Sequence, residues 1–283
     1  MTDYTTPRCP SKNPYLMEAP DEIKKMTING LMLKVAETVD EIKKAQELRY
    51  KVFYEEYGAD PIGEMGTLKR DYDRFDDVST HLLVIDINDP DDHKVIGTYR
   101  MFRQVVSDDM HEFYTESEFD ITPLKKNAKN LMEVGRSCIL DGYRTRFALQ
   151  LLWQGIGAFI FHHEVDFLFG CASFEGYTDP QELALPLSYL YHYHLAREEV
   201  RPKALDKYFQ SINLIPKEEI NPKEAVKQLP PLVKGYLRLN GIIGDGAMID
   251  MQWKSVDICI MVEKATLSEK HVEYYRRDRS AKE

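Results

Sequence analysis

Several features that mark particular classes of protein are scarce in this sequence. Four of its 283 residues are cysteine, and Cys9, Cys138, Cys171 and Cys259 are too scattered for a disulfide framework or a CxxC metal site. Basic residues are not in excess, because 37 Lys and Arg face 47 Asp and Glu, giving a formal net charge of -10. Reduced thiols are therefore expected and nucleic-acid binding is not, and a phosphate-bearing partner would need a local basic patch.

A long hydrophobic run is also absent. The longest apolar stretch, at 147–161, is interrupted by Gln150 and Gln154 and is shorter than the roughly 18 residues that a membrane-spanning helix needs. The first 25 residues lack the apolar run and the small-residue cleavage site of a secretory signal. These absences predict a cytoplasmic protein, and 43% hydrophobic with 30% charged residues predicts a globular one with a sizeable core.

What the sequence does contain is a succession of periodic segments. Thr38 and Glu41 form a capping box, and apolar residues at helical spacing then predict an amphipathic helix at 41–58. The β-rich runs at 81–87 and 94–103 flank a turn-like Asn-Asp-Pro-Asp-Asp segment, which predicts an antiparallel hairpin.

A strand, a helix and a second strand follow in the middle of the chain. Strands are predicted at 131–140 and 166–174, with a helix at 145–162 between them. A crossover helix joins parallel strands, so these two strands are expected to run in parallel. The next helix is predicted to start near Asp179 and to be kinked or shortened by Pro186.

The domain organisation follows from where these periodic segments begin and end. Residues 1–29 mix Pro, Lys, Asn and Asp without periodicity, which predicts a flexible N-terminal arm before a first strand at 31–38. One α/β domain is expected at 30–264, with a mobile polar insertion at 197–229 before two closing apolar runs. Residues 265–283 are expected to form a C-terminal tail.

The side chains best suited to chemistry are spread over four segments. They are Arg49 and Phe53 in the first helix, Asp73 and Asp76 in DYDRFDD, Arg100 in GTYRMFR, and Glu133 with Arg136 in MEVGRS. Residues four apart on a helix share a face, whereas residues three apart on a strand point to opposite faces. Glu133 and Arg136 can therefore face one pocket only if a bulge intervenes. Each charge taken singly reads as a solvated surface residue, but the set together indicates a site.

This set resembles the functional residues of the acyl-homoserine-lactone synthases, which have the GCN5-related N-acetyltransferase fold. The sequence is similar, more closely, to the ornithine Nα-acyltransferases that make lyso-ornithine lipid. The resemblance covers approximately Leu31 to Glu263 and is most specific in LRYKVFYEE, DYDRFDDVSTHLLV, EVGRSCIL and LFGCASFEGYTDP. It implies an α/β fold with a mixed central sheet flanked by helices and a helical insertion before the last strands. Ala59 stands where the lactone synthases carry Trp, which favours the ornithine branch.

The resemblance also bears on the acyl donor. Relatives that use coenzyme A have a glycine-rich turn after the central strand, whose N–H groups at a helix N-terminus hold the pyrophosphate. Here Phe147 and Leu149 stand at the glycine positions, and bulky side chains there obstruct the close approach of backbone to pyrophosphate. The resemblance therefore implies acyl carrier protein as donor, with the acyl chain on its phosphopantetheine arm, and no other cofactor or metal.

Basic residues are the expected contacts for the acidic carrier protein. Arg144 and Arg146 are predicted to bind the donor. Lys125, Lys126 and Lys129 are read equally well as further carrier contacts and as ordinary solubilising charges.

Glu133 is the predicted catalytic base. Amide formation from a thioester needs a neutral amine, a route for its proton and donors for the oxygen that becomes negative. Glu133 lies mid-strand in an apolar context, where burial would raise its pKa, and it would act directly or through a water. The resemblance implies that backbone N–H groups of the same strand supply the oxyanion donors. The alternative is that Glu133 merely pairs with Arg100 or Arg136.

The acceptor is expected to be held by opposite charges. Arg49 or Arg100 would bind the α-carboxylate of an amino acid, and Asp73 or Asp76 would bind a cationic side chain. Ornithine fits, and lysine fits nearly as well, because one methylene discriminates by only about 1–3 kcal/mol. Residues 55–92 contain 12 acidic and 3 basic residues, so this region should attract a cation.

Two further segments have a plain and a functional reading. Cys171 and Ser173 lack a recognisable His-and-acid arrangement, so small buried strand residues are expected rather than a covalent acyl-enzyme. The C-terminal EYYRRDRSAKE combines aromatic residues with three arginines. It is read either as a peripheral contact with anionic lipid at the inner face of the membrane or as a frayed tail.

These observations predict an N-acyltransferase that moves a 3-hydroxyacyl chain from acyl carrier protein to the α-amine of ornithine, giving lyso-ornithine lipid. An acyl-homoserine-lactone synthase, or an acyltransferase for another amino acid, is the alternative within the same fold. A non-catalytic module that binds lipid or carrier protein is the alternative of another class, although such a module would need no base at Glu133.

Overall fold

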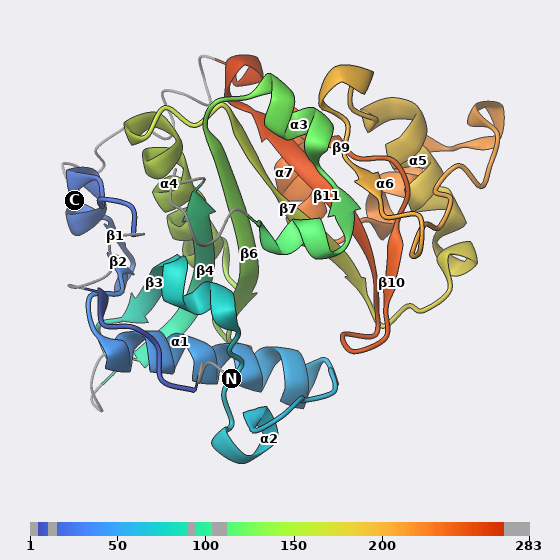
Figure 1. Ribbon diagram of the computed structural model, residues 1–283. Coiled ribbons are helices and arrows are strands. Elements are labelled where there is room, and N and C mark those ends of the chain that lie inside the picture. Colours follow the sequence, from blue (N-terminus) through green and yellow to red (C-terminus); the bar gives the residue numbers. More distant parts are fainter. Residues whose placement is uncertain (1–4, 11–15, 90–93, 104–111, 269–283) are drawn as a thin grey trace. The chain divides into compact units, whose positions relative to one another are not determined.

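A computed structural model describes residues 5–10, 16–89, 94–103 and 112–268 (Figure 1). The chain forms two compact units, each built from separate segments. The first comprises the described residues within Met1–Val105 and Val134–Val165, and the second those within Val106–Glu133 and Asp166–Ser268. Neither unit is continuous in sequence. No linker in the sequence therefore separates the two units, both of which include residues of the single domain expected at 30–264.

The first unit is built on an antiparallel sheet. Its strands are β1 (Thr27–Ile28), β2 (Leu31–Val35), β3 (Thr80–Asp86) and β4 (Lys94–Arg103), each paired with the next. The antiparallel pairing of β3 with β4 confirms the predicted hairpin. Its α-helices are α1 (Val39–Tyr50), which continues as a π-helical turn, η3 (Lys51–Glu56), the short α2 (Met65–Leu68), and α4 (Arg146–His162). The capping box is confirmed, since the backbone N–H groups of Thr38 and Glu41 each bond to the other residue's side chain.

Two helices of the first unit cover opposite faces of this sheet. A Cβ atom on Gly155 of α4 would lie 2.6 Å from the side chain of Leu33 and 2.7 Å from that of Leu82. The glycine therefore allows α4 to pack closely on β2 and β3. The neighbouring residue on β3, His81, points to the other face and interacts with Arg49 of α1, as the alternation of a strand requires.

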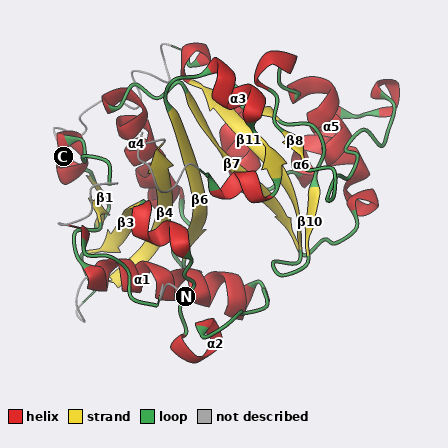
Figure 2. Ribbon diagram, in the orientation of Figure 1, coloured by secondary structure: helices red, strands yellow, loops and turns green. Residues whose placement is uncertain are grey.

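The second unit contains a mixed sheet and a small two-stranded sheet (Figure 2). The first three residues of β6 (Leu131–Ile139) pair in parallel with β7 (Phe167–Glu175), which confirms the predicted parallel strands. β7 pairs antiparallel with β11 (Ser255–Glu263), which also pairs with β10 (Met248–Asp250) and β9 (Ile242–Ile243). β5 (Phe119–Asp120) pairs with β8 (Lys203–Ala204). The α-helices are α3 (Thr122–Asn127), α5 (Ala184–His194), α6 (Pro222–Gln228) and α7 (Pro231–Arg238).

Pro186 shortens the predicted helix at its start. Asp179 caps a 3-10 turn, η6 (Pro180–Leu183), by accepting a hydrogen bond from the backbone N–H of Gln181 at 2.9 Å. The α-helix α5 begins only at Ala184, so Pro186 lies in its first turn. The backbone N–H groups of a first turn have no partner within the helix, and a proline there removes no helical hydrogen bond.

Residues 16–29, which belong to the predicted N-terminal arm, contain regular structure. They contain the 3-10 turn η2 (Asp21–Lys25) and strand β1, and the side chains of Met17 and Ile23 are buried. Apolar anchors spaced irregularly show no periodicity, which is why the sequence pattern does not reveal them.

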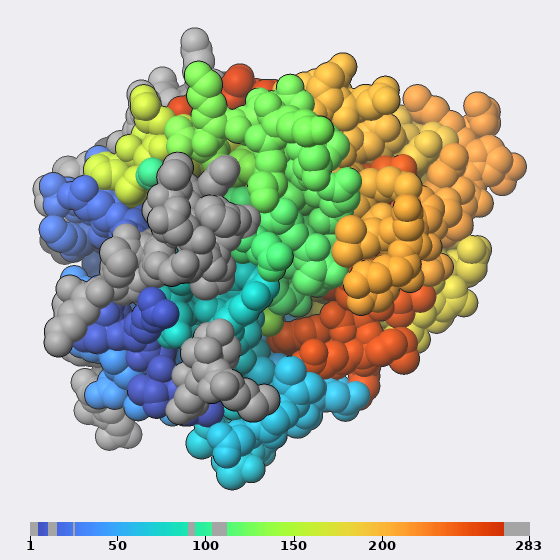
Figure 3. All heavy atoms as spheres, in the orientation of Figure 1, coloured from blue at the N-terminus to red at the C-terminus, as the bar shows by residue number. Residues whose placement is uncertain are grey.

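The polar insertion at 197–229 also has structure. It contains η7 (Glu198–Val200), β8, η8 (Lys217–Glu219) and α6, and its atoms, in orange shades, lie at the surface in Figure 3. The C-terminal basic segment, from Glu269 onward, lies outside the described residues. Within the residues that are described, no helix combines the length and hydrophobicity needed to cross a bilayer.

Candidate active site

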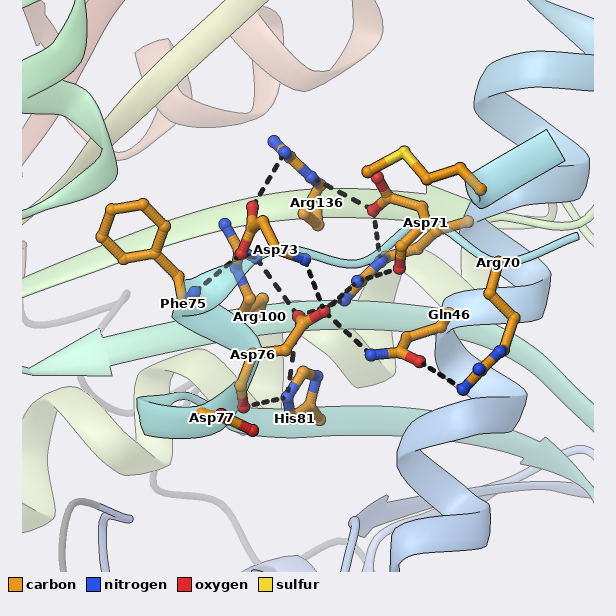
Figure 4. Close-up of polar contacts among 12 residues, drawn as sticks. Gln46, Arg70, Asp71, Asp73, Phe75, Asp76, Asp77, His81, Arg100 and Arg136 are labelled. Carbon is orange, nitrogen blue, oxygen red and sulfur yellow. Dashed lines mark hydrogen bonds and ion pairs between the residues drawn. The ribbon is translucent and has the colours of Figure 1, made fainter. Parts of the chain in front are cut away.

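A network of arginines and aspartates occupies the first unit (Figure 4). Its aspartates lie on the segment that leads into a 3-10 turn, η4 (Arg74–Val78). Asp73 caps this turn by accepting a hydrogen bond from Phe75 N–H at 2.8 Å, and Asp76 accepts one from Asp73 N–H at 3.3 Å. The backbone N–H of Asp71 bonds to the carbonyl oxygen of Gln46 at 3.0 Å, which ties the segment to α1.

Arg49 of α1 is the most buried member of the network. Its Nη1 and Nη2 atoms donate to the two carboxylate oxygens of Asp76 at 3.0 and 2.8 Å, a bidentate arrangement. Its Nε lies 2.7 Å from Oδ2 of Asp71, and Nη2 also donates to the Asp71 carbonyl at 2.6 Å. The side chain of Arg49 is 0% exposed, so its charge is compensated entirely inside the protein.

Two further arginines complete the network. Arg100 of β4 donates from Nη1 to Asp73 at 2.6 Å and to Asp76 at 3.2 Å. Arg136 of β6 donates to Asp71 at 3.2 Å and to Asp73 at 3.0 Å. Arg136 has a φ of 53°, a left-handed conformation that interrupts the regular alternation of the strand.

The positive and negative charges of the network balance one another. Burial opposes ionisation of Asp76, but the positive charges of Arg49 and Arg100 outweigh it and hold the pKa of Asp76 far below its usual range. Burial lowers the pKa of His81 to about 4, so this imidazole is neutral at pH 7, and its Nε2 lies 3.1 Å from the Asp76 carbonyl. Three guanidinium groups face three carboxylates, which leaves the network without excess charge.

The structure thus brings together five of the six residues predicted to bind the acceptor. They are Arg49, Asp73, Asp76, Arg100 and Arg136, while Phe53 lies buried in η3. Only the side chains of Asp73, 22% exposed, and Arg136, 12% exposed, reach toward solvent. The acceptor-binding roles stay predictions, and the geometry favours these two residues for them. Sequence reasoning missed Asp71, although its alternation with Asp73 in DYD is a visible signal.

Glu133 lies in the second unit, buried at the end of the β6 segment that pairs with β7. Its Oε2 accepts a hydrogen bond from the N–H of Tyr114 at 2.9 Å. Its Oε1 accepts from the N–H and hydroxyl of Thr115 at 2.6 and 2.5 Å. These three bonds hold the carboxylate in one position. Thr115, eighteen residues away in sequence, carries no pattern that would have identified it.

Cys171 is not an activated nucleophile. Burial, together with the negative charge of Glu118, raises the pKa of the Cys171 thiol well above its ordinary value. A nucleophilic cysteine needs the opposite environment. Its Sγ lies 3.7 Å from the Thr115 hydroxyl, which is consistent with the expected small buried strand residue.

The predicted donor-binding residues lie near the start of α4. Arg144 donates from Nη2 to Glu56 at 2.6 Å and from Nε to the Ile139 carbonyl at 3.1 Å. Arg146 is exposed at the first position of α4. Lys125 pairs with Glu116 at 2.9 Å. None of these contacts tests the donor-binding role, which stays a prediction.

Part of the chain matches a known domain family, and solved structures resemble it more distantly. Residues 48–154 match the family model described as an acetyltransferase (GNAT) domain. Two solved structures are similar at 10–11% identity and a TM-score of 0.46. They are FeeM, an N-acyl amino acid synthase from uncultured soil microbes, covering 85% of this chain and 96% of its own, and the AHL synthase LasI, covering 87% and 94%.

Curated relatives are much more similar in sequence. The L-ornithine N(alpha)-acyltransferase of Rhizobium meliloti is 41% identical over 255 residues, 89% of this chain and 86% of the relative. The proteins of the same name from Brucella abortus, at 41% identity, and Rhodobacter capsulatus, at 37%, cover 88% and 87% of this chain and 89% and 94% of their own lengths. The chain has the mixed α/β GNAT fold, and it belongs to the L-ornithine Nα-acyltransferase family of enzymes.

Proposed function

We propose that this enzyme transfers a 3-hydroxyacyl chain from the phosphopantetheine thiol of acyl carrier protein to the α-amine of ornithine, giving lyso-ornithine lipid. The observation that carries the proposal is the 41% identity, over 89% of the chain, to a relative named for acylating ornithine at this nitrogen. The bulky Phe147 and Leu149 in the first turn of α4 support a donor without a pyrophosphate.

The reaction exchanges a thioester for an amide. The lone pair of the α-amine attacks the thioester carbonyl carbon, the C–N bond forms, and the tetrahedral intermediate collapses with cleavage of the C–S bond. In the proposal Glu133 takes the proton that the amine nitrogen loses, directly or through a water, and the phosphopantetheine sulfur leaves and is protonated to the thiol. The hydrogen bonds from Tyr114 and Thr115 support this role because they hold the carboxylate in one position.

The arginine–aspartate network has a mainly positioning role in this proposal. Arg49, Asp71 and Asp76 are enclosed by one another and keep the more exposed Asp73 and Arg136 in place. Arg136 is the arginine we assign to the α-carboxylate of the acceptor, because its side chain is more exposed than those of Arg49 and Arg100.

Reconstitution with defined substrates tests the function. Purified full-length protein is incubated with 3-hydroxyacyl-carrier protein and ornithine, and the amide is detected by mass spectrometry. Parallel reactions replace the donor by the matching acyl-coenzyme A, or the acceptor by lysine or S-adenosylmethionine. We expect the amide with the carrier-bound donor and ornithine. Absence of product with every amino acid would overturn the proposed activity, and a lactone from S-adenosylmethionine would replace it.

Substitution of the basic residues near α4 tests the donor. Arg144→Gln and Arg146→Gln are expected to raise the KM for the acylated carrier protein and to weaken its dependence on salt, leaving the KM for ornithine unchanged. Lys227→Gln is the control, since Lys227 pairs with Glu224 at the surface of α6. An unchanged KM for the carrier in both arginine variants would remove these residues from the donor site.

A further inference from the structure

One face of the mixed sheet in the second unit carries polar side chains. Residues that lie opposite each other in a β-ladder point to the same face of the sheet. Asp250 lies opposite Ser255, and Asp257 lies opposite Ser173, so these side chains share one face through the alternation of β11. Cys171 lies two residues before Ser173 on β7 and belongs to the same face.

Three carboxylates meet on this face, and we call Glu118, Asp250 and Asp257 the acidic cluster. One carboxylate oxygen from each lies within 4.8 Å of the others. Glu118 is 3% and Asp257 4% exposed. One oxygen of Asp250 accepts hydrogen bonds from the backbone N–H groups of Gln252 and Trp253 at 2.8 and 3.0 Å, which orients that carboxylate.

The surroundings of Glu118 oppose its ionisation. Burial and then the negative charge of Asp257 raise the pKa of Glu118 to about 8. Oε2 of Glu118 is buried without a hydrogen-bond partner in the described part of the chain. This environment contrasts with that of Asp73 and Asp76, whose charges three arginines already match.

A separate observation points to a ligand. The Ser255 hydroxyl is 0% exposed and has no hydrogen-bond partner within the described residues. Ser255 lies directly opposite Asp250 and two residues from Asp257, so it points to the side of the sheet that carries the acidic cluster. A buried hydroxyl without a partner is rare unless a bound group or water satisfies it.

The acidic cluster is linked by side chains to Glu133. The Thr115 hydroxyl, which donates to Glu133, lies 3.7 Å from Sγ of Cys171, and Cys171 in turn interacts electrostatically with Glu118. Glu133 lies opposite Phe169, two residues before Cys171, and therefore on the same face of the sheet.

We propose that the acidic cluster binds the side-chain ammonium of the acceptor amino acid and so directs its α-amine toward Glu133. The proposal rests on the proposed function and names the residues that select a cationic acceptor. A primary ammonium offers three N–H donors and one positive charge, which suit three carboxylates and the Ser255 hydroxyl. In this proposal the acidic cluster, and not Asp73 and Asp76, recognises the cationic side chain.

The first experiment compares two acceptors of equal carbon length. Norvaline has the skeleton of ornithine without the side-chain amine. Steady-state acylation is measured for the wild type, Asp257→Asn, Glu118→Gln and, as control, Asp206→Asn, whose carboxylate is exposed and paired with Lys203. We expect the wild type to prefer ornithine by at least about 100-fold in kcat/KM, since a site built for a polar group rejects its apolar analogue strongly. Both cluster variants should raise the KM for ornithine by about tenfold or more with little change for norvaline, and the control should match the wild type.

The outcomes separate the two proposals. Equal use of norvaline and ornithine by the wild type, or an unchanged KM for ornithine in both cluster variants, overturns the role of the acidic cluster while leaving the activity in place. No product with ornithine in the wild type overturns the proposed function instead. In that case calorimetric titration of ornithine into the same four proteins, without donor, still tests whether the acidic cluster binds ornithine. The proposal requires that the wild type binds ornithine and that Asp257→Asn does not.

Folding and metal binding are checked in the same proteins. Removing one of several like charges should leave the unliganded variants at least as stable to heat as the wild type, and ornithine should raise the Tm of the wild type only. Stoichiometric Mg²⁺ or Ca²⁺ binding that is lost in Asp257→Asn, together with activity that requires the ion, would make the cluster a metal site and overturn the proposal.

Discussion

Asp76 holds the polar network of the first unit together. It accepts hydrogen bonds from Gln46, Arg49 and Arg100, and it is buried. Two positive charges would therefore lose a shared partner if its own charge were removed. Asp76 is recognisable in the sequence by its residue type and spacing, but a repeated Asp does not reveal that its partners are arginines of the same chain.

The charge of Asp76 is expected to matter for folding. Asp76→Asn should lower the free energy of unfolding by about 3–5 kcal/mol, because removing one member of a buried ion pair leaves the other charge uncompensated. Urea denaturation followed by circular dichroism measures the change. Asp141→Asn, at a carboxylate that is 84% exposed, is the control and should stay within about 0.5 kcal/mol of the wild type. Equal stability of the two variants would contradict the account of the network.

Glu133 is expected to matter for turnover. Glu133→Gln should lower kcat by about 10²–10⁴-fold, because the amide cannot take a proton from the amine. Its effect on folding should be smaller, since Gln keeps one oxygen to accept from Thr115. Glu224→Gln, at an exposed ion pair on α6, is the control. Wild-type turnover in Glu133→Gln would remove this residue from the mechanism.

At the scale of elements, α1 positions the network because both of its ends are defined. Its N-terminus is set by the capping box of Thr38 and Glu41, and its C-terminus passes into the π-helical turn η3 without a break. The change of period places Phe53 and Tyr54 in the buried interior, and Tyr54 donates to Asp71 at 3.1 Å. Helical spacing in the sequence predicted the helix, whereas the π-helical turn has no periodicity of its own over so few residues.

The cap of α1 gives a prediction at this scale. Thr38→Ala should lower the free energy of unfolding by about 1 kcal/mol, because the hydroxyl that satisfies the Glu41 N–H is lost. Thr38→Ser keeps the hydroxyl and should retain most of the stability. The two variants are compared by thermal and urea unfolding, and equal loss in both would show that the cap hydrogen bond contributes nothing.

At the scale of the whole molecule, the negative charge is divided between two different environments. The acidic segment at 55–92 supplies Asp71, Asp73 and Asp76, but arginines from three other segments neutralise them. In the acidic cluster of the second unit, burial and then the negative charge of Asp257 raise the pKa of Glu118. Regional acidity in the sequence therefore pointed to the aspartates that are already compensated.

Stability should depend on pH in two opposite directions. The pKa of His81 is lowered to about 4, so the unfolded chain binds more protons and stability falls as the pH drops from 6.5 toward 4. The lowered pKa values of Asp73 and Asp76 extend this loss below pH 4. The pKa of Glu118 is raised to about 8. Its contribution to folding stability is therefore fully present below about pH 4.5 and is lost as the pH rises through 8.

Urea denaturation between pH 4 and 9 measures both effects. His81→Gln should flatten the acid side of the profile, and Glu118→Gln should flatten the alkaline side. Parallel profiles for the wild type and both variants would contradict the assigned pKa shifts.

The sequence by itself determined the periodic elements and the family resemblance. The capping box, the hairpin of β3 and β4, the parallel strands β6 and β7, and the residue types of the arginine–aspartate set follow from local pattern, which neighbouring residues specify. Only the tertiary structure decided which charges meet. Arg49 compensates Asp76 from 27 residues away, while Glu118 is grouped with Asp250 and Asp257 from the far end of the chain. Such pairings depend on strand register and burial. These are set by packing between segments that are distant in the sequence, and the local sequence of one segment does not specify which other segment it will contact.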